Sequence, residues 1–357
     1  MSTTELADNA TDFQPVSGPA VWSADEMRAR TDWLYRLTEA DIAELEAAEA
    51  AFTASGADLL DISRDNFPLR AFGETLKGIR HDILHGRGFV QLRGLPVERY
   101  ARERAAKIYM GLSAHLGDAM PSQNYKGHVL GHIFNIGETY ANPNNRGPYT
   151  KERIPYHCDA CDVVGLLCLS TARSGGESML ASSGHLYNEL LKTRPDLVEP
   201  LTRPVYRDRR GEVPPGKEPW YAIPVLNFHD GLLSVSLEPS YTRSVGRHFD
   251  EDPNAPEVYE GIQAMQELAD KHRLDIAFEP GDMQFLCNYT VTHSRQAFED
   301  YEGADRRRHL LRLWLSCDDA RDVPDPFWDR HADRASLRRP GGIVGPDTVL
   351  NCPLEPA

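Results

Sequence analysis

Cysteine is scarce in this sequence. Six cysteines in 357 residues are too few for a disulfide framework. Cys158 and Cys161 have C-x-x-C spacing, and no second pair of this kind completes a four-ligand zinc site. We therefore interpret the cysteines as buried, reduced thiols.

Long apolar runs and an excess of basic charge are absent as well. No uncharged apolar run approaches the roughly 18 residues that a membrane-spanning helix needs. The first residues lack the basic and apolar regions of a secretory signal. We therefore expect a cytoplasmic protein with no membrane partner. Because 54 acidic residues outnumber 39 basic ones, the formal net charge is −15, which argues against nucleic acid as a partner. A small anionic substrate needs only one or two well-placed arginines and is not excluded.

The hydrophobic pattern divides the chain into parts. Residues 1–36 are polar, and we expect a loose leader. Helical spacing of apolar residues follows, with a capping box at Thr38 and Asp41 and further helices at 69–85 and 99–116. From about residue 120, short apolar runs alternate with turns and one helix at 256–272, which is typical of a β barrel or sandwich with helical decoration. We expect a single domain over 37–357, with a helical part at about 37–117, a β core at about 120–318 and a C-terminal tail.

Two histidines and an aspartate are the candidate metal ligands. His157 and Asp159 lie two residues apart, and side chains at that spacing face the same side of a strand. His293 follows the later apolar run 283–286. Two imidazoles and one carboxylate form the facial set of non-haem Fe(II) oxygenases, which leaves coordination positions open.

Two arginines stand in an otherwise apolar run near residue 310. Strand parity places Arg308 and Arg312 on one face, and Leu311 and Leu313 on the other. Arginines in so apolar a strand are costly unless each meets an anion. A pocket that binds carboxylates would supply that partner.

Five segments, in a fixed order, carry a resemblance to a known family. They are residues 88–96 (GFVQLRGLP), His157-x-Asp159, residues 175–178 (GGES), the stretch from Gly281-Asp282 to His293, and Arg308-x-x-x-Arg312. Together they resemble the taurine dioxygenase-like (TauD/TfdA) branch of the Fe(II)/2-oxoglutarate-dependent oxygenases, which includes clavaminate synthase.

The resemblance implies a fold, cofactors and residue roles. The fold would be mainly β, a double-stranded β-helix (jelly-roll) core with N-terminal helices packed outside. Fe(II), 2-oxoglutarate and O2 would meet at one site, where His157, Asp159 and His293 are the catalytic iron ligands. Arg308 and the Ser178 hydroxyl would bind the distal carboxylate of 2-oxoglutarate, with Ser178 standing where the family often has threonine.

The resemblance also implies a reaction class and a place for the substrate. Arg312 matches a position that often contacts substrate. Independently of the resemblance, Gln123 and Asn124, in a loop that would help to select the substrate, and Arg153, four residues before His157, are further candidates for substrate binding. Halogenating relatives replace the metal carboxylate with a small residue, whereas this chain keeps Asp159. We expect hydroxylation, desaturation or cyclisation of a small carboxylate-bearing molecule, such as an amino acid or a natural-product intermediate, with release of succinate and CO2.

Two other interpretations stay open at the level of sequence. One is a non-catalytic β-barrel binding protein with a degenerate pocket, although no ligand or carboxylate anchor is missing. The other is a cupin-like metal-dependent isomerase or hydrolase that does not use 2-oxoglutarate. Release of succinate separates the oxygenase from the isomerase or hydrolase. The identity of the substrate and the oligomeric state do not follow from the sequence.

Overall fold

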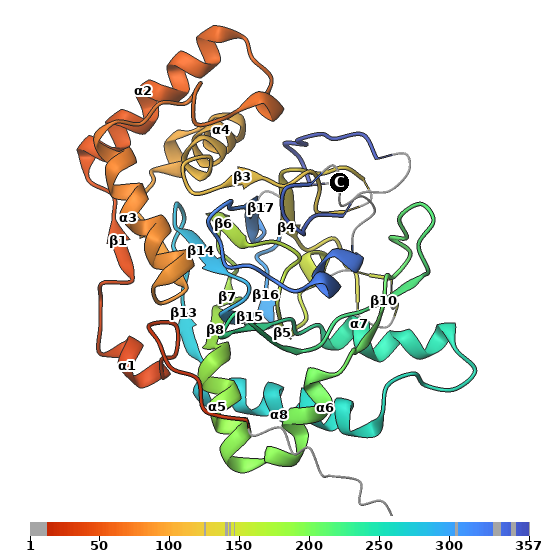
Figure 1. The fold of residues 1–357 in the computed structure, drawn as a ribbon. Helices are drawn as coiled ribbons and strands as arrows, with labels where there is room; N and C mark the ends of the chain where they lie inside the picture. Colours follow the sequence, from red (N-terminus) through yellow and green to blue (C-terminus); the bar gives the residue numbers. More distant parts are fainter. Residues whose placement is uncertain are drawn as a thin grey trace, which may run out of the picture.

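The computed structural model describes residues 13–124, 126–139, 142, 144–145, 147–303, 306–330, 337–343 and 348–356. A mainly β, jelly-roll core lies at the centre of the molecule, and helices pack outside it (Figure 1). This architecture confirms the fold class predicted from the sequence.

The larger of the two main sheets has seven strands. Its order is β1-β2-β14-β6-β17-β3, and β4 also pairs with β17. β1 and β2 run parallel, while the other pairs are antiparallel. The strands are β1 (Leu34–Arg36), β2 (Phe89–Arg93), β3 (Asp118–Ala119), β4 (Gly131–Phe134), β6 (Val163–Ser170), β14 (Met283–Cys287) and β17 (His309–Ser316).

The smaller sheet has four antiparallel strands in the order β13-β8-β15-β5. They are β13 (Leu274–Ile276), β8 (Ser178–Ser182), β15 (Val291–Arg295) and β5 (Ile154–His157). Three two-stranded pairs complete the β structure: β7 (Ser174–Gly175) with β16 (Phe298–Glu299), β9 (Tyr206–Asp208) with β10 (Trp220–Ala222), and β11 (Leu226–His229) with β12 (Leu232–Val235).

Apolar side chains from both main sheets meet in one buried cluster, so the two sheets face each other. Phe89, Val164 and Leu286 reach this cluster from the larger sheet. Leu180 and Val291 reach it from the smaller sheet. Burial of apolar surface between the sheets is the main source of their stability, at about 25 cal/mol for each Å² removed from water.

Helices cover the outer faces of both sheets (Figure 1). Side chains of α2, α3 and α4 pack against the larger sheet, and side chains of α5, α6 and α8 pack against the smaller one. The helices are α1 (Ala24–Arg28), α2 (Glu39–Ser55), α3 (Ala71–His85), α4 (Arg102–Ser113), α5 (Ser183–Thr193), α6 (Val198–Thr202), α7 (Pro239–Ser244) and α8 (Pro256–His272). Within the described ranges, none of the helices is both long enough and apolar enough to cross a membrane.

Local sequence signals explain several element boundaries. The Thr38 hydroxyl accepts the Asp41 backbone N–H, and the Asp41 carboxylate accepts the Thr38 N–H, so the predicted capping box starts α2. Gly56, with φ of 70°, follows its last turn. The apolar run 222–228 is divided between β10 and β11, because Pro224 between them has no N–H to donate to a neighbouring strand.

The segment before residue 37 differs from the loose leader expected from its polar sequence. Residues 1–12 lie outside the described residues, but the following chain packs against the core. Trp22 is 3% exposed, its indole N–H donates to the Arg87 carbonyl at 2.8 Å, and its ring lies 5.3 Å from that of Phe89. Met27 is buried in the same cluster, and β1 extends the larger sheet. A few large apolar residues therefore anchor a segment that is polar on average.

Trp22→Ala should lower the free energy of unfolding by about 3–5 kcal/mol, because it removes a buried aromatic side chain and leaves a cavity. Urea denaturation measures the change. Asp25→Ala is the matched control on α1, since that side chain is 93% exposed and its loss should change stability by less than about 0.5 kcal/mol. Equal stability of Trp22→Ala and the unmodified chain would favour a loose leader after all.

Candidate functional site

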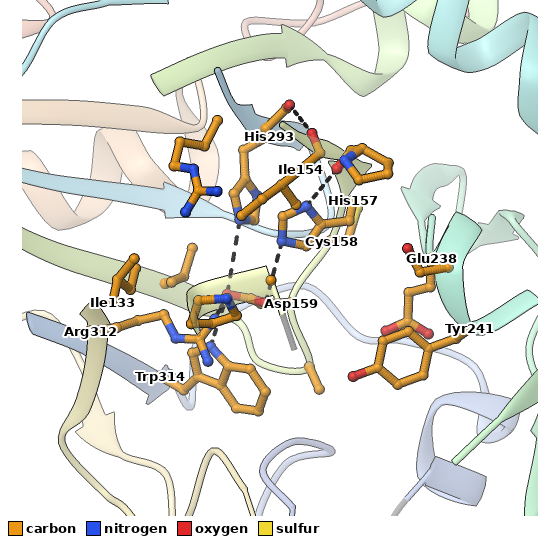
Figure 2. Close-up of a pocket in the computed structure, with 18 of the residues that line it drawn as sticks. Ile133, Ile154, His157, Cys158, Asp159, Glu238, Tyr241, His293, Arg312 and Trp314 are labelled. Carbon is orange, nitrogen blue, oxygen red and sulfur yellow. Dashed lines mark hydrogen bonds and ion pairs between the residues drawn. The ribbon is translucent and has the colours of Figure 1, made fainter. Parts of the chain in front are cut away.

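The three predicted metal ligands come together between neighbouring strands of the smaller sheet (Figure 2). His157 on β5 stands directly opposite His293 on β15, and the two ring centroids are 4.3 Å apart. Asp159 follows the end of β5, so it reaches the histidines from a loop rather than from the strand that its spacing predicts. One ligand atom from each residue lies within 4.8 Å of those of the other two.

Hydrogen bonds orient two of these three side chains. His157 Nδ1 donates to the Pro155 carbonyl at 2.9 Å, so the proton is on Nδ1 and the Nε2 lone pair is available to a metal. Nε2 lies 3.8 Å from Asp159 Oδ1. Asp159 Oδ2 accepts the Trp314 indole N–H at 2.9 Å, and the Asp159 backbone N–H donates to Asn288 Oδ1 at 2.9 Å. Asp159 is thus fixed at both its backbone and its carboxylate.

The site favours the protonation states that metal binding requires. Burial alone would raise the pKa of Asp159, but the Arg312 guanidinium and the two histidines outweigh it and hold that pKa well below its usual range. Burial, together with the neighbouring His157, lowers the pKa of His293 to about 3. At neutral pH the carboxylate is therefore ionised and the His293 imidazole is neutral, as metal ligands must be.

A cavity of about 150 Å³ adjoins the triad, and Arg308, Arg312, Trp314 and Ser178 line it. Arg308, Arg312 and Trp314 share the face that lines the cavity. Leu311 and Leu313 pack against the helices on the opposite face, as strand parity predicts.

Arg308 is a buried cation with unused hydrogen-bonding capacity. It is 5% exposed, and its Nη2 donates to the Gly176 carbonyl at 3.2 Å. Within the described residues, its Nη1 has no hydrogen-bond partner and no carboxylate forms an ion pair with it. Burial accordingly lowers the pKa of Arg308 to about 10. A buried guanidinium of this kind is costly unless a ligand supplies a negative charge.

Ser178 also lines the cavity, but its hydroxyl proton is engaged. The Oγ–H donates to Gln284 Oε1 at 2.7 Å, and Gln284 lies on β14 of the facing sheet. The Ser178 oxygen can still accept a hydrogen bond. To donate one to a carboxylate, the hydroxyl must first rotate away from Gln284.

Arg312 lies between the metal-ligand triad and the larger sheet. Its Nη1 is 3.4 Å from Asp159 Oδ2, and its guanidinium lies 5.0 Å from the centre of the Trp314 ring. Its Nε donates to Gln123 Oε1 at 2.7 Å. Arg312 therefore lines the cavity and at the same time contacts the candidate metal ligand Asp159.

The three other predicted substrate residues lie outside the cavity lining. Gln123 is 1% exposed and fixes the Arg312 side chain by accepting its Nε–H. The Gln123 amide nitrogen also donates to the carbonyls of Val129 and Arg312. Asn124 shapes its own turn, with Oδ1 accepting two backbone N–H groups. The Arg153 side chain is 46% exposed and pairs with Asp270 on α8. These residues were candidates because they are polar and close to the site in sequence. Those two properties do not indicate whether a side chain points into the cavity or away from it.

The structure places further residues in the site that the sequence analysis did not identify. Asn288 and Trp314 both hold Asp159, yet neither residue type alone indicates such a contact. Glu238 and Tyr241 lie across the pocket from Asp159 (Figure 2). They come from a loop and from a short helix that the hydrophobic pattern does not predict.

Gln123→Leu should destabilise the protein by at least about 2 kcal/mol, because it leaves Arg312 Nε and two buried carbonyls without partners. Chemical denaturation of the metal-free protein measures this loss without any dependence on substrate. The control is Gln263→Leu on the exposed face of α8, where the side chain bonds only to Glu267 on the surface. Undiminished stability of Gln123→Leu would contradict a bracing role.

Comparisons with known proteins show which family this chain resembles. The family model described as "Taurine catabolism dioxygenase TauD, TfdA family" matches residues 51–314. FR-33289 synthase from Streptomyces rubellomurinus is 33% identical over 321 residues, which cover 87% of this chain and 93% of that protein. The taurine hydroxylase-like protein SAT17 from Stachybotrys chartarum is 32% identical over 309 residues, which cover 82% of this chain and 77% of that protein.

A solved structure shares the fold. Asparagine oxygenase in complex with Fe(II), 3-hydroxyasparagine and succinate has a TM-score of 0.64 and 17% sequence identity, over 80% of this chain and 94% of that one. The family model covers most of the chain, and the FR-33289 synthase match spans nearly the whole of both proteins. The chain therefore belongs to the TauD/TfdA family of dioxygenases.

Proposed function

We propose that His157, Asp159 and His293 hold the Fe(II) ion of this dioxygenase, and that Arg308 holds its 2-oxoglutarate. As a TauD/TfdA family member, the chain is a non-haem iron dioxygenase that uses Fe(II), 2-oxoglutarate and O2. The observation that carries the residue assignment is the placement of Arg308. This unpaired, buried guanidinium lines the same cavity as three converging metal-ligand side chains.

The donor set suits ferrous iron. Two neutral imidazoles and one carboxylate bind Fe(II) on one face and leave positions open for a chelating cosubstrate and O2. The hydrogen bond at His157 Nδ1 and the Trp314 contact at Asp159 Oδ2 fix ligand directions before metal arrives, which lowers the cost of assembling the site. With Fe(II) bound, O2 and 2-oxoglutarate supply the oxidising power, and 2-oxoglutarate leaves as succinate and CO2.

Arg308 suits the distal carboxylate of 2-oxoglutarate. The planar fork of a guanidinium donates parallel hydrogen bonds to one carboxylate, and the charge of that ligand would balance the buried cation. Ser178 would assist after its hydroxyl turns from Gln284, or would remain an acceptor at the edge of the cavity.

The proposed substrate is a small molecule with a carboxylate, held by Arg312. The cavity lies beside the triad, between the two sheets, which favours a molecule of amino-acid size over a polymer. The structural relative whose complex contains 3-hydroxyasparagine supports a substrate of that size. Hydroxylation, desaturation and cyclisation are the reactions we propose, because all three begin with removal of hydrogen from a substrate carbon held beside the triad.

His293→Ala should abolish stoichiometric Fe(II) binding, because the facial set loses one of its three ligands. Anaerobic loading followed by metal analysis measures iron independently of turnover. His185→Ala is the control, since His185 pairs with His272 outside the cavity and should leave iron loading unchanged. A variant that retained iron without His293, or zinc held by Cys158 and Cys161, would contradict the ligand assignment.

Arg308→Ala should weaken 2-oxoglutarate binding by roughly ten- to a hundredfold, the equivalent of about 1.5–3 kcal/mol for a charge-assisted contact. Arg308→Lys should weaken it less, because lysine keeps the charge without the fork. Arg312→Ala should leave 2-oxoglutarate affinity nearly intact while substrate-dependent turnover falls and uncoupled succinate formation persists.

Anaerobic titration of the iron-loaded variants with 2-oxoglutarate compares these affinities. Iron content is measured in parallel, because Arg312 also contacts Asp159. If Arg312→Ala damaged 2-oxoglutarate affinity more than Arg308→Ala, the two roles would be reversed.

A further inference from the structure

The wall of the pocket opposite Asp159 is built around a second group of arginines. Arg209 follows β9, and Arg330 ends the short 3-10 helix Asp325–Arg330. Both line the cavity together with Glu238 and Tyr221. Figure 2 shows Glu238 on this side, across the pocket from Asp159. We call this group, with the fully buried Arg207 behind it, the far wall.

Backbone carbonyls hold the Arg209 side chain in place without neutralising it. Arg209 is 5% exposed, and its guanidinium donates to the carbonyls of Glu218, Asp329 and Arg330 at 2.6–2.8 Å. These acceptors carry no net charge, and burial lowers the pKa of Arg209. Its positive charge is therefore fixed at the far wall without a carboxylate partner among the described residues.

Glu238 is the carboxylate of the far wall, and cations already surround it. Its Oε1 is 2.5 Å from Arg330 Nη2, and its Oε2 is 3.5 Å from Arg207 Nη1. The Tyr221 hydroxyl also donates to Oε2. Glu238 is thus neutralised within the protein, so the far wall offers no available anion to a substrate ammonium group.

Among the residues that the structure describes, charge at the far wall does not balance. Arg207, Arg209 and Arg330 carry three positive charges against the one negative charge of Glu238, which leaves an excess of two. Arg330 Nε is buried and has no hydrogen-bond partner among the residues described. Buried cations in this number are costly unless an anion joins them.

Within the described ranges, no acid other than Glu238 forms an ion pair with Arg207, Arg209 or Arg330. Asp208 has its own cations, with Arg247 Nε at 2.9 Å and His248 Nε2 at 2.8 Å. Arg210 and Glu212 also line the cavity, and their charges offset each other.

We propose that the far wall binds a doubly charged oxyanion of the phosphate or phosphonate type, carried by the substrate at the end remote from its oxidised carbon. A group with charge near −2 matches the excess, and its three oxygens can accept hydrogen bonds from several guanidinium groups at once. This inference rests on the proposed function and adds the substrate class. The substrate has two anionic ends, and an ammonium group at the far wall is disfavoured.

Anaerobic protein loaded with Fe(II) and saturating 2-oxoglutarate is the form to test, because its metal positions and Arg308 are then occupied. Calorimetric titration with methylphosphonate, acetate and methylammonium compares the three charge types. Methylphosphonate should bind about tenfold or more tightly than acetate, and methylammonium should not bind. The proposed oxyanion is attached to a carbon atom of the substrate, so the subsite must have room for that carbon. Methylphosphonate should therefore bind at least as tightly as inorganic phosphate. A site that accepted inorganic phosphate and rejected methylphosphonate would overturn the assignment to substrate.

Variants locate the binding. Arg330→Gln should weaken methylphosphonate binding by about tenfold or more, whereas Arg330→Lys should retain most of it by keeping the charge beside Glu238. Arg209→Gln removes the far-wall cation that only backbone carbonyls hold, and should also weaken binding. Arg203→Gln is the control for overall charge, since that side chain is 67% exposed and pairs with Glu199.

Two outcomes would overturn the far-wall subsite: methylphosphonate binding that survives both Arg330→Gln and Arg209→Gln, and methylphosphonate that displaces 2-oxoglutarate. Normal binding of Fe(II) and 2-oxoglutarate in these variants shows that they are folded. If Fe(II) and 2-oxoglutarate bind to the unmodified protein but methylphosphonate does not, the subsite alone fails. If neither binds, the proposed function fails.

Discussion

The pairing of β5 with β15 is the constraint on which the site depends. Directly opposed residues of an antiparallel pair bring their side chains close together, and His157 and His293 occupy one such pair. A shift of the register by one residue would turn His293 to the other face of the sheet. β8 holds β15 from its other side, with Ser178 opposite Arg295, so the same ladder also places the serine of the cavity. Two distant stretches of sequence thereby form one site.

Charge inside the cavity is organised differently from charge on the whole chain. The net charge of −15 describes a surface rich in acids, whereas six arginines and three acids line the cavity. In this buried setting each ionised group depends on its neighbours, because charges interact more strongly than in water. Asp159 stays ionised through Arg312 and the histidines, whereas the Arg308 guanidinium forms no ion pair with a described residue and its pKa is lowered by burial. An acidic protein can therefore contain a site for anions.

Periodicity and capping signals were sufficient for much of the fold. The capping box at Thr38, the helix at 256–272 and the alternating faces of β17 all depend on local spacing, which a sequence displays directly. The convergence of the triad was predicted from residue type and order. The direction of Gln123 depends on packing against β17, and Asp159 is held by Trp314 from the facing sheet. Contacts of that kind form only after distant segments meet, so local spacing cannot predict them.

The N-terminal segment has a consequence for association between molecules. β1 forms one edge of the larger sheet, and Trp22 covers Phe89 on the neighbouring strand β2. An exposed sheet edge with apolar residues is a template on which other chains add strands. β1 is only three residues long and ends in an arginine, which makes it a poor template. A chain lacking this segment would expose the edge of β2 with its buried residues Phe89, Val90 and Leu92, so we expect a short, polar stretch of sequence to limit aggregation of the enzyme.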